Sequence, residues 1–270
     1  MSELDRLLNT VQHCSALELL ARLPDASVDC VVTSPPYDNL RTYNGYTFEF
    51  EPVARETFRV LKPGGVCVWV VGDATVNGSE TLTSMRQALY FVDVCGFRMH
   101  DTMIWTKSTG GSFGNRYCPT FEYMFVFSKD EPNTFNPCLK RNKHAGHKTR
   151  KGNSTVANGW VEKEEKRITK EFGILENVWY IPSGGFGTTK ERGVYDHPAM
   201  FPEELARRHI ETWTNPNDIV LDYFGGSGTT AKMARQYERN YITCDISAEY
   251  CDLMSKRLAM PFTPLFPAFL

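Results

Sequence analysis

The five residues from Thr33 to Tyr37 bring together groups that could hold a planar ring. They follow an apolar run at 28–32, interrupted only by Asp29 and Cys30, that predicts a buried strand. Two consecutive prolines must end this strand in a stiff turn, because each removes a backbone donor and fixes φ. The Ser34 hydroxyl and the Pro35 carbonyl could each accept one N–H of an exocyclic amine, while the Tyr37 ring stacks on the base. A plain strand-to-loop turn with Tyr37 in the core is equally compatible with these residues.

A second stretch whose residues could bind a ligand lies near the other end of the chain. The apolar residues 219–222 predict a buried strand, and the glycine-rich residues 225–228 follow it before a helix that begins near Thr229. A further strand is predicted at 241–244 and ends at Asp245. A carboxylate at the tip of a strand beside a glycine loop is suited to hold ribose hydroxyls.

The glycine loop by itself does not identify its ligand. Gly226 and Gly228, followed by Ala231, fit a loose G-x-G-x-x-A fingerprint that would serve NAD or S-adenosylmethionine, since both carry an adenosine. Only about forty residues follow Gly228, too few to build the rest of a dinucleotide sheet. The remaining strands must come from upstream, so the loop and the Ser34 turn are expected to face one crevice. This arrangement, without a hydride-transfer constellation, favours S-adenosylmethionine.

Strands and helices alternate over most of the chain. The sequence predicts strands at 66–71, 99–106 and 121–128 and a helix at 81–95. The run at 66–71 is apolar almost throughout, as in a parallel strand buried on both faces. We therefore expect an α/β fold with a mostly parallel sheet.

Two polar segments interrupt this alternation. Residues 38–46 predict an exposed loop or a lid whose Arg41 and Tyr43 touch substrate. Residues 130–177 lose the apolar strands, and residues 139–151 carry a run of cations without an acid, which indicates phosphate contacts. His144 and His147 lack a partner spaced to complete a metal site, so no metal is expected.

The composition is that of an ordinary globular protein. The chain has 270 residues, 41% apolar and 23% charged, and a net charge of −2, so nucleic-acid binding would need local basic patches. No apolar run reaches the length of a membrane span and no signal peptide is evident, so we expect a cytoplasmic protein without membrane contact. The eight cysteines form no C-x-x-C pair and are expected to be reduced thiols.

Taken together, these stretches resemble the motifs of amino-type DNA methyltransferases, enzymes that use S-adenosylmethionine to methylate exocyclic nitrogens of bases. Residues 33–37 resemble the catalytic motif in its TSPPY form, and residues 222–230 resemble the cofactor motif D-P-F-x-G-S-G-T-T, with Tyr223 where proline is usual. Asp245 matches the acidic ribose-binding position, and residues 197–203 resemble a motif that packs near the methionine end of the cofactor. The order of the motifs is that of the family's β group.

The resemblance implies a Rossmann-like methyltransferase domain formed by 1–129 and 178–270, with 130–177 inserted as a target-recognition region. The catalytic residues it implies are Ser34, Pro35, Pro36 and Tyr37. The cofactor-binding residues it implies are Thr33, His197, Pro198, Asp222, Phe224, Gly226, Ser227, Gly228, Thr229, Thr230 and Asp245. The residues expected to contact DNA are Arg41, Tyr43, Lys140, Arg141, Lys143, Lys148, Arg150 and Lys151.

TSPPY is usually associated with cytosine-N4 enzymes and DPPY with adenine-N6 enzymes. The resemblance therefore implies site-specific methylation of cytosine N4 in DNA after the base is flipped out of the duplex. Adenine-N6 methylation, a nicotinamide-dependent oxidoreductase and a non-catalytic DNA-binding module are the alternatives. DNA is the expected partner, and a homodimer and a cognate restriction endonuclease are left open.

Overall fold

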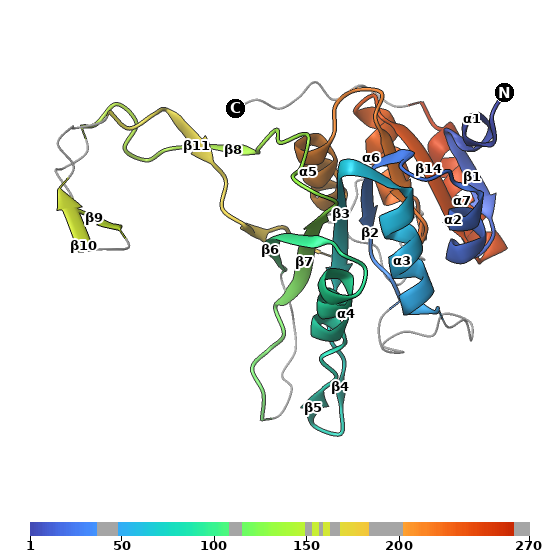
Figure 1. Cartoon of the computed structure of the whole chain (residues 1–270), viewed down its shortest axis with the longest axis horizontal. Coiled ribbons are helices and arrows are strands. Elements are labelled where there is room, and N and C mark those ends of the chain that lie inside the picture. The colour runs from blue at the N-terminus through green and yellow to red at the C-terminus, as the bar shows by residue number, and fades with distance from the viewer. Residues whose placement is uncertain are drawn as a thin grey trace. The chain divides into compact units, whose positions relative to one another are not determined.

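The computed structural model describes residues 1–36, 48–107, 115–148, 153–156, 159–162, 168–183 and 202–261. The chain divides into two compact units. Unit 1 comprises Met1–Asn136 and Asn177–Leu265, and the described part of unit 2 lies within Pro137–Glu176. Each unit is described by itself below, with the element labels of Figure 1.

Unit 1 is built on an eight-stranded sheet. In spatial order its strands are β1 (Thr10–His13), β14 (Asn240–Asp245), β13 (Ile219–Asp222), β2 (Val28–Thr33), β3 (Leu61–Val71), β7 (Phe121–Ser128), β6 (Arg98–Thr106) and β12 (Val178–Tyr180). The strands from β1 to β3 run parallel, and β12 runs parallel to β6. The mostly parallel α/β sheet is confirmed. The exception is β7, which is antiparallel to both β3 and β6.

Seven helices are described in unit 1. They are α1 (Glu3–Leu7), α2 (Ala16–Arg22), α3 (Phe50–Val60), α4 (Thr83–Asp93), α5 (Glu203–Trp213), α6 (Thr229–Gln236) and α7 (Ala248–Ala259). Figure 1 shows α3 and α6 in the body of the unit, and the hairpin of β4 (Thr75–Val76) and β5 (Ser79–Glu80) extending beyond α4. No helix among the described residues is long and apolar enough to cross a membrane.

The helices cover both faces of the sheet. Trp69 on β3 pairs with Phe125 on β7, and the ring of Phe91 on α4 lies 5.1 Å from that of Trp69. Neighbouring residues of a strand point to opposite faces, so Met124 lies on the other face, where its sulfur is 3.3 Å from His209 Nε2 on α5. Helices on both faces of a mostly parallel sheet confirm the Rossmann-like architecture.

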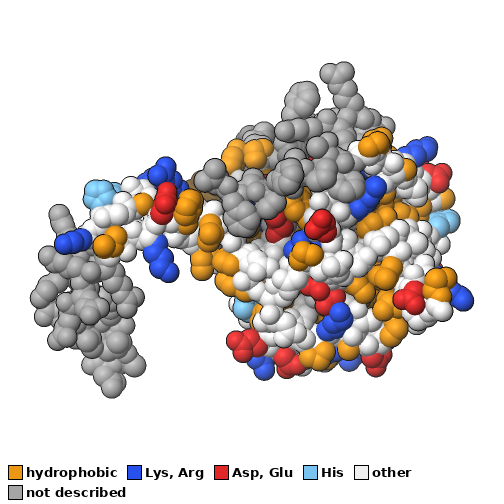
Figure 2. All heavy atoms as spheres, turned by 90° about the horizontal axis from the view of Figure 1, so that it is seen from above, with side chains coloured by type: hydrophobic (Ala, Val, Ile, Leu, Met, Phe, Trp, Pro, Cys, Tyr) orange, Lys and Arg blue, Asp and Glu red, His pale blue; other side chains and the backbone are white. Residues whose placement is uncertain are grey.

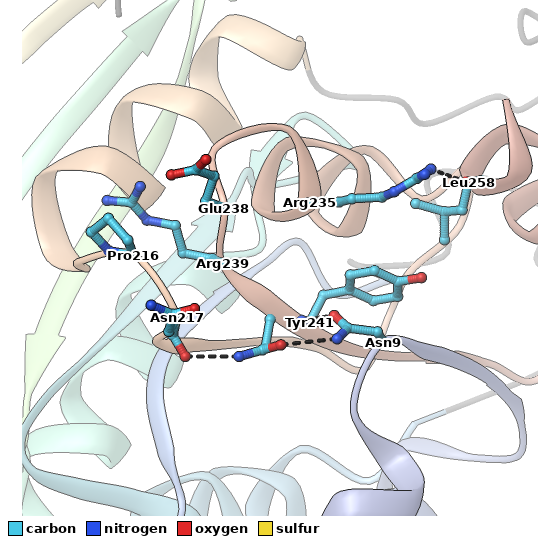
Figure 3. A pocket seen from close by; sticks show the side chains of 9 residues that line it. Asn9, Pro216, Asn217, Arg235, Glu238, Arg239, Tyr241 and Leu258 are labelled. Atoms are coloured by element: carbon cyan, nitrogen blue, oxygen red, sulfur yellow. Dashed lines mark hydrogen bonds between the residues drawn. The ribbon is translucent and has the colours of Figure 1, made fainter. Parts of the chain in front are cut away.

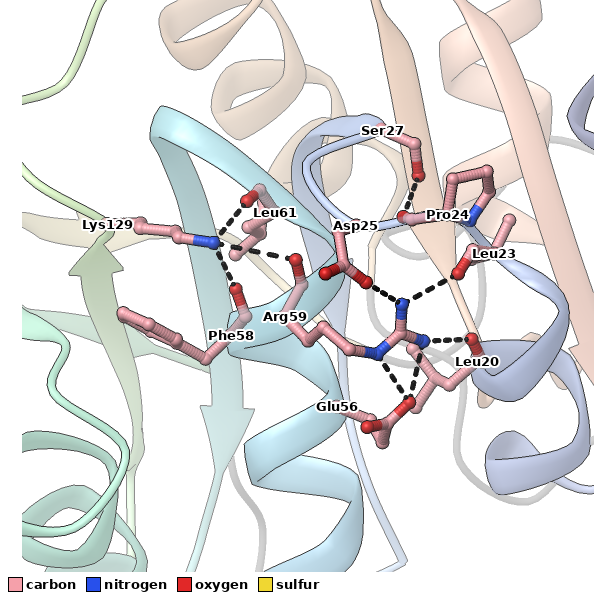
Figure 4. A network of polar contacts seen from close by, with 10 residues as sticks. All are labelled: Leu20, Leu23, Pro24, Asp25, Ser27, Glu56, Phe58, Arg59, Leu61 and Lys129. Atoms are coloured by element: carbon pink, nitrogen blue, oxygen red, sulfur yellow. Dashed lines mark hydrogen bonds and ion pairs between the residues drawn. The ribbon is translucent and has the colours of Figure 1, made fainter.

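Two cations join neighbouring elements at the end of the sheet where β2 and β3 begin (Figure 4). The Arg59 guanidinium donates to two carbonyls at the end of α2, at 2.8 and 2.9 Å. Lys129 Nζ donates to the carbonyls of Phe58 and Leu61 at 2.8 and 2.9 Å and lies 4.6 Å from the centroid of the Phe58 ring. Both side chains thus donate to carbonyls near the carboxyl ends of α2 and α3, and Lys129 also to the carbonyl of the first residue of β3.

The described part of unit 2 contains two short antiparallel ladders. β8 (Leu139–Arg141) pairs with β11 (Phe172–Ile174), and β9 (Asn153–Val156) pairs with β10 (Gly159–Glu162). The sequence predicts that 130–177 loses the apolar strands, and the strands found here are three or four residues long, too short to show a hydrophobic period. Residues 130–136 belong to unit 1, where Asn136 N donates to Thr212 O at 2.8 Å.

Candidate active site

The two stretches singled out by their chemistry lie on adjacent strands, although 189 positions separate Thr33 from Asp222. β2 and β13 are paired in parallel, with Cys30 opposite Val220. At their carboxyl ends Thr33 Oγ1 donates to Asp222 Oδ1 at 2.7 Å, and both residues are buried. The same carboxylate oxygen accepts the backbone N–H of Phe224 at 3.1 Å. The turn after β2 and the loop after β13 are therefore held together at one edge of the sheet.

The turn itself keeps a hydroxyl available. Ser34 and Pro36 are half-buried and Pro35 is buried. Within the described part of the chain, no residue forms a hydrogen bond with the Ser34 hydroxyl. This hydroxyl can accept an N–H from a ligand at the carboxyl edge. Tyr37, Arg41 and Tyr43 lie outside the described residues.

The loop after β13 can be built only with glycine at two positions. A Cβ at Gly225 would lie 2.4 Å from Thr243 Oγ1 and 2.7 Å from Met254 Sδ. Gly228 has φ +77° and a Cβ there would lie 2.9 Å from Met254 Cγ. The loop consequently rests directly on β14 and α7.

Asp245 stands at the tip of β14 beside this loop. Its Oδ2 accepts the N–H of Gly226 at 2.9 Å, and its Oδ1 accepts the N–H of Ser247 at 2.9 Å. Burial raises the pKa of Asp245, and these backbone N–H groups lower it in part. Each carboxylate oxygen has a second lone pair, so the group fits the role of an acceptor for ribose hydroxyls. The donor set and the glycine loop together suit the adenosine part of a cofactor.

The hydroxyls of the loop bond within the protein. Thr230 Oγ1 donates to Val32 O at 3.1 Å, which adds a second link to β2. The buried hydroxyl of Thr229 accepts from Arg257 on α7 at 3.2 Å, and Ser227 Oγ lies 3.3 Å from Thr229 Oγ1. These three hydroxyls are therefore engaged within the protein.

Sequence reasoning missed Arg257. It is 3% exposed, although arginine is almost never buried unless it is paired. A signal was present in the sequence, because Arg257 lies three positions after Met254 and so falls on the apolar face of α7.

Asp222 is a buried carboxyl group with an altered acidity. Burial raises its pKa to about 6, against the lowering effect of its hydrogen bonds with Thr33 and the backbone of Phe224. The structure shows this carboxyl joining two strands within the protein.

The basic residues of unit 2 fall into two groups. Lys140 pairs with Glu176, and Arg141 lies 3.3 Å from Glu171. Lys143 and Lys148 are exposed, and neither forms an ion pair with any residue that the structure describes. Figure 2 shows several Lys and Arg side chains on this unit. Arg150 and Lys151, like His197 and Pro198 in unit 1, lie outside the described residues.

A hollow of about 690 Å³ lies elsewhere in unit 1, where β14 begins (Figure 3). Its polar side chains are engaged in internal contacts: Asn9 Nδ2 donates to Asn240 Oδ1 at 2.9 Å, and Arg239 Nη2 donates to Thr214 O at 2.7 Å. It lies at the opposite end of β14 from Asp245, and these contacts mark it as structural.

No cluster of His, Cys, Asp and Glu side chains that could hold a metal ion occurs among the described residues.

Comparison with known proteins gives a consistent result. The family model described as DNA methylase, N6_N4_Mtase, matches residues 28–256. The orphan methyltransferase M.BamHII of Bacillus amyloliquefaciens is 52% identical over 238 residues, which cover 87% of this chain and 89% of the relative. The type II methyltransferase M.BglII of Bacillus subtilis is 28% identical, over 91% of this chain and 68% of the relative.

Solved structures share the fold. The PvuII cytosine-N4-specific DNA methyltransferase has a TM-score of 0.65 at 22% identity, with 92% of this chain and 85% of that chain covered. A Thermus thermophilus protein, described as a putative DNA modification methylase and solved in complex with S-adenosyl-L-methionine, has a TM-score of 0.62 at 27% identity, with 93% of each chain covered.

Proposed function

The chain belongs to the DNA methylase family that acts on N6 and N4 amino groups, and on that premise we propose that it methylates the exocyclic N4 of cytosine in DNA. S-adenosylmethionine is the methyl donor of this family. The proposal specifies the base, the residues that act on it and the residues that hold the cofactor.

The observation that carries the proposal is the Thr33–Asp222 hydrogen bond of 2.7 Å. It joins the turn that can accept an amine to the loop that can hold an adenosine cofactor. The serine of the turn supports cytosine, because the resemblance of residues 33–37 is to the TSPPY motif. Adenine N6 is the second candidate for the methylated amine, since the family includes both activities.

The turn would act by positioning the amine. The Ser34 hydroxyl and the Pro35 carbonyl each accept one N–H, which draws the nitrogen from its planar geometry and localises its lone pair. Tyr37 stacks on the flipped base, and its π face favours the positive charge that develops on the nitrogen. Most of the acceleration comes from this positioning and from fixed dipoles rather than from proton abstraction by the serine.

The residues at the ends of β13 and β14 would hold the cofactor, which supplies an electrophilic methyl group on a sulfonium. Asp245 accepts from the ribose hydroxyls, and the backbone of residues 225–228 lies against the ligand. Residues 197 and 198 are assigned to its methionine end by resemblance alone. These roles, and those of the remaining predicted cofactor residues, are proposals.

The test is methyl transfer from labelled S-adenosylmethionine to mixed-sequence DNA, followed by digestion to nucleosides and mass spectrometry. Labelled N4-methylcytosine is expected. Labelled N6-methyladenine would keep the family and overturn the assignment of the base. No label in either nucleoside, from protein that binds the DNA, would favour a non-catalytic binding module.

Three further expectations from the sequence stay predictions. A homodimer, a cognate restriction endonuclease and a cytoplasmic location each need an experiment of their own. The relative at 52% identity is named an orphan methyltransferase and the relative at 28% identity a type II methyltransferase. A nicotinamide-dependent oxidoreductase is the weakest alternative, because family membership and the position of the loop both favour a methyl donor.

A further inference from the structure

Arg257 reaches from α7 to the loop that follows β13. Its Nη1 donates to the carbonyl of Ser227 at 2.9 Å and to Thr229 Oγ1 at 3.2 Å. The side chain is 1% exposed. These contacts link a single cation to two of the four residues 227–230, where the loop becomes the first turn of α6.

The same guanidinium is held by a carboxylate on a third element. Arg257 Nη2 pairs with Oε1 of Glu203, the first residue of α5. Lys232 Nζ on α6 donates to the same oxygen at 2.8 Å. One carboxylate therefore connects α5, α6, α7 and the glycine loop. Glu203 directly follows Pro202, at the end of the segment that resembles the motif for the methionine end of the cofactor.

Stability alone does not account for this network. A buried ion pair must offset the loss of hydration of both charges, and a well-packed apolar group often serves stability as well or better. The guanidinium also lies beside the amino end of α6, where the helix dipole is positive and disfavours a cation. What the guanidinium contributes is orientation, because its rigid set of N–H donors fixes the Ser227 carbonyl and the Thr229 hydroxyl relative to each other.

We propose that Arg257, held by Glu203, is a positioning residue that sets the glycine loop in its cofactor-binding conformation. The inference rests on the proposed function, because it assigns the loop to S-adenosylmethionine. With Arg257 in place, the Ser227 carbonyl and the Thr229 hydroxyl bond within the protein, and the loop is held in one conformation. Without it, the loop samples other conformations, and binding must select one of them at a cost in affinity.

Arg235 provides a matched control. It lies on α6, and its Nη1 donates to the carbonyl of Leu258 on α7. It thus joins the same two helices as Arg257, and it does so at the carboxyl end of α7, through the carbonyls of Leu258 and Met260. Arg235→Met should cost stability without altering the loop.

The experiment measures the equilibrium binding of S-adenosylhomocysteine by calorimetry, and thermal unfolding without ligand, in the wild type, Arg257→Met, Arg257→Lys and Arg235→Met. Arg257→Met is expected to weaken binding tenfold or more, and Arg235→Met less than threefold at a similar loss of Tm. Arg257→Lys should recover part of the affinity, because an ammonium can reach one partner but not both sides of the fork. In turnover, the KM for S-adenosylmethionine should rise while the KM for DNA changes less than threefold.

Two other results would overturn the inference. Equal loss of affinity in Arg257→Met and Arg235→Met would mean that Arg257 has a structural role only. Unchanged affinity in Arg257→Met would mean that Arg257 does not act on the cofactor site. If Arg257→Met does not fold, Glu203→Gln replaces it, with an expected threefold or greater loss; unchanged affinity there overturns the inference. A wild type that does not bind S-adenosylhomocysteine would overturn the proposed function itself.

Discussion

At the scale of single residues, the carboxyl group of Asp222 joins the two strands that carry the chemistry. It is 3% exposed and accepts from both Thr33 and the backbone of Phe224. A hydrogen-bonded carbonyl oxygen would serve this link as well as a carboxylate. An uncharged side chain of the same shape should therefore keep the hydrogen bonds of Asp222 while removing its charge.

Asp222→Asn should change how stability depends on pH. Burial raises the pKa of Asp222 from 3.8 to about 6, so the folded state keeps its proton in a range where the unfolded state has lost it. Stability then falls as pH rises from about 4 to about 6, by roughly 3 kcal/mol in all. Asparagine does not ionise, so the stability of the variant relative to the wild type should increase by roughly 1–2 kcal/mol between pH 5 and pH 8.

Urea unfolding of both proteins at these two pH values measures the difference. A gap that stays constant with pH would mean that Asp222 is ionised throughout or that its folded pKa is ordinary.

Ser34→Ala and Asp245→Ala should separate catalysis from cofactor binding. Ser34 contacts the amine in the proposed site, so its loss should lower kcat by tenfold or more and leave the affinity for S-adenosylmethionine within about threefold. Asp245→Ala should mainly weaken the cofactor, because it removes the acceptor for the ribose. Tyr37→Ala is expected to behave like Ser34→Ala. Titration of the cofactor and single-turnover methyl transfer measure both quantities, and equal losses in all three variants would indicate misfolding.

At the scale of elements, the glycine loop depends on close contact with α7. Gly228→Ala places a methyl group 2.9 Å from Met254 Cγ at φ +77°. Gly78, in the hairpin of β4 and β5, has the same φ of +77° with nothing within 4 Å of the added Cβ. Both substitutions incur the left-handed strain of roughly 1–2 kcal/mol, and only Gly228→Ala adds a steric conflict.

Gly228→Ala is therefore expected to lose more stability than Gly78→Ala and to lose tenfold or more in cofactor affinity, whereas Gly78→Ala keeps its affinity. Thermal unfolding and S-adenosylhomocysteine calorimetry provide the comparison. Equal losses in the two variants would show that backbone strain, rather than contact with α7, determines the effect of substitution in the loop.

Lys129→Met should destabilise the junction of α3 and β3. The ammonium satisfies the carbonyls of Phe58 and Leu61 at 2.8 and 2.9 Å, and methionine cannot donate to them. Hydrogen bonds from a charged donor contribute roughly 1.5–3 kcal/mol, so a loss of that order is expected in urea unfolding. Lys256→Met, at an exposed position of α7, is the control and should stay within about 0.5 kcal/mol. A similar small loss at Lys129 would mean that water replaces its contacts.

At the scale of the whole molecule, a net charge of −2 requires DNA affinity to come from local cations. Among the predicted contacts in unit 2, Lys140 and Arg141 have carboxylate partners, whereas Lys143 and Lys148 are exposed without an ion pair to any described residue. The second pair is therefore freer to neutralise phosphates.

The double variant Lys143→Ala with Lys148→Ala should flatten the salt dependence of DNA binding. Each phosphate contact contributes about −0.9 to the slope of log K against log salt concentration, so the slope should become less negative by roughly 1.8. The matched variant Lys140→Ala with Arg141→Ala should change it less, because its cations are already paired. Fluorescence anisotropy over a range of salt concentrations measures both, and an unchanged slope in the first variant would remove unit 2 from the phosphate contacts.

The sequence by itself determined the strands at 28–32 and 219–222, the glycine-rich loop at 225–228, and Asp245 at the end of its strand. These follow from hydrophobic period and turn chemistry, which depend on neighbours in the chain. The tertiary structure alone decided that β7 lies antiparallel between β3 and β6, that Asp222 bonds to Thr33, and that Arg257 supports the loop. Such contacts join residues as far as 189 positions apart, and which residues meet depends on how the sheet is ordered and packed, which no local pattern encodes.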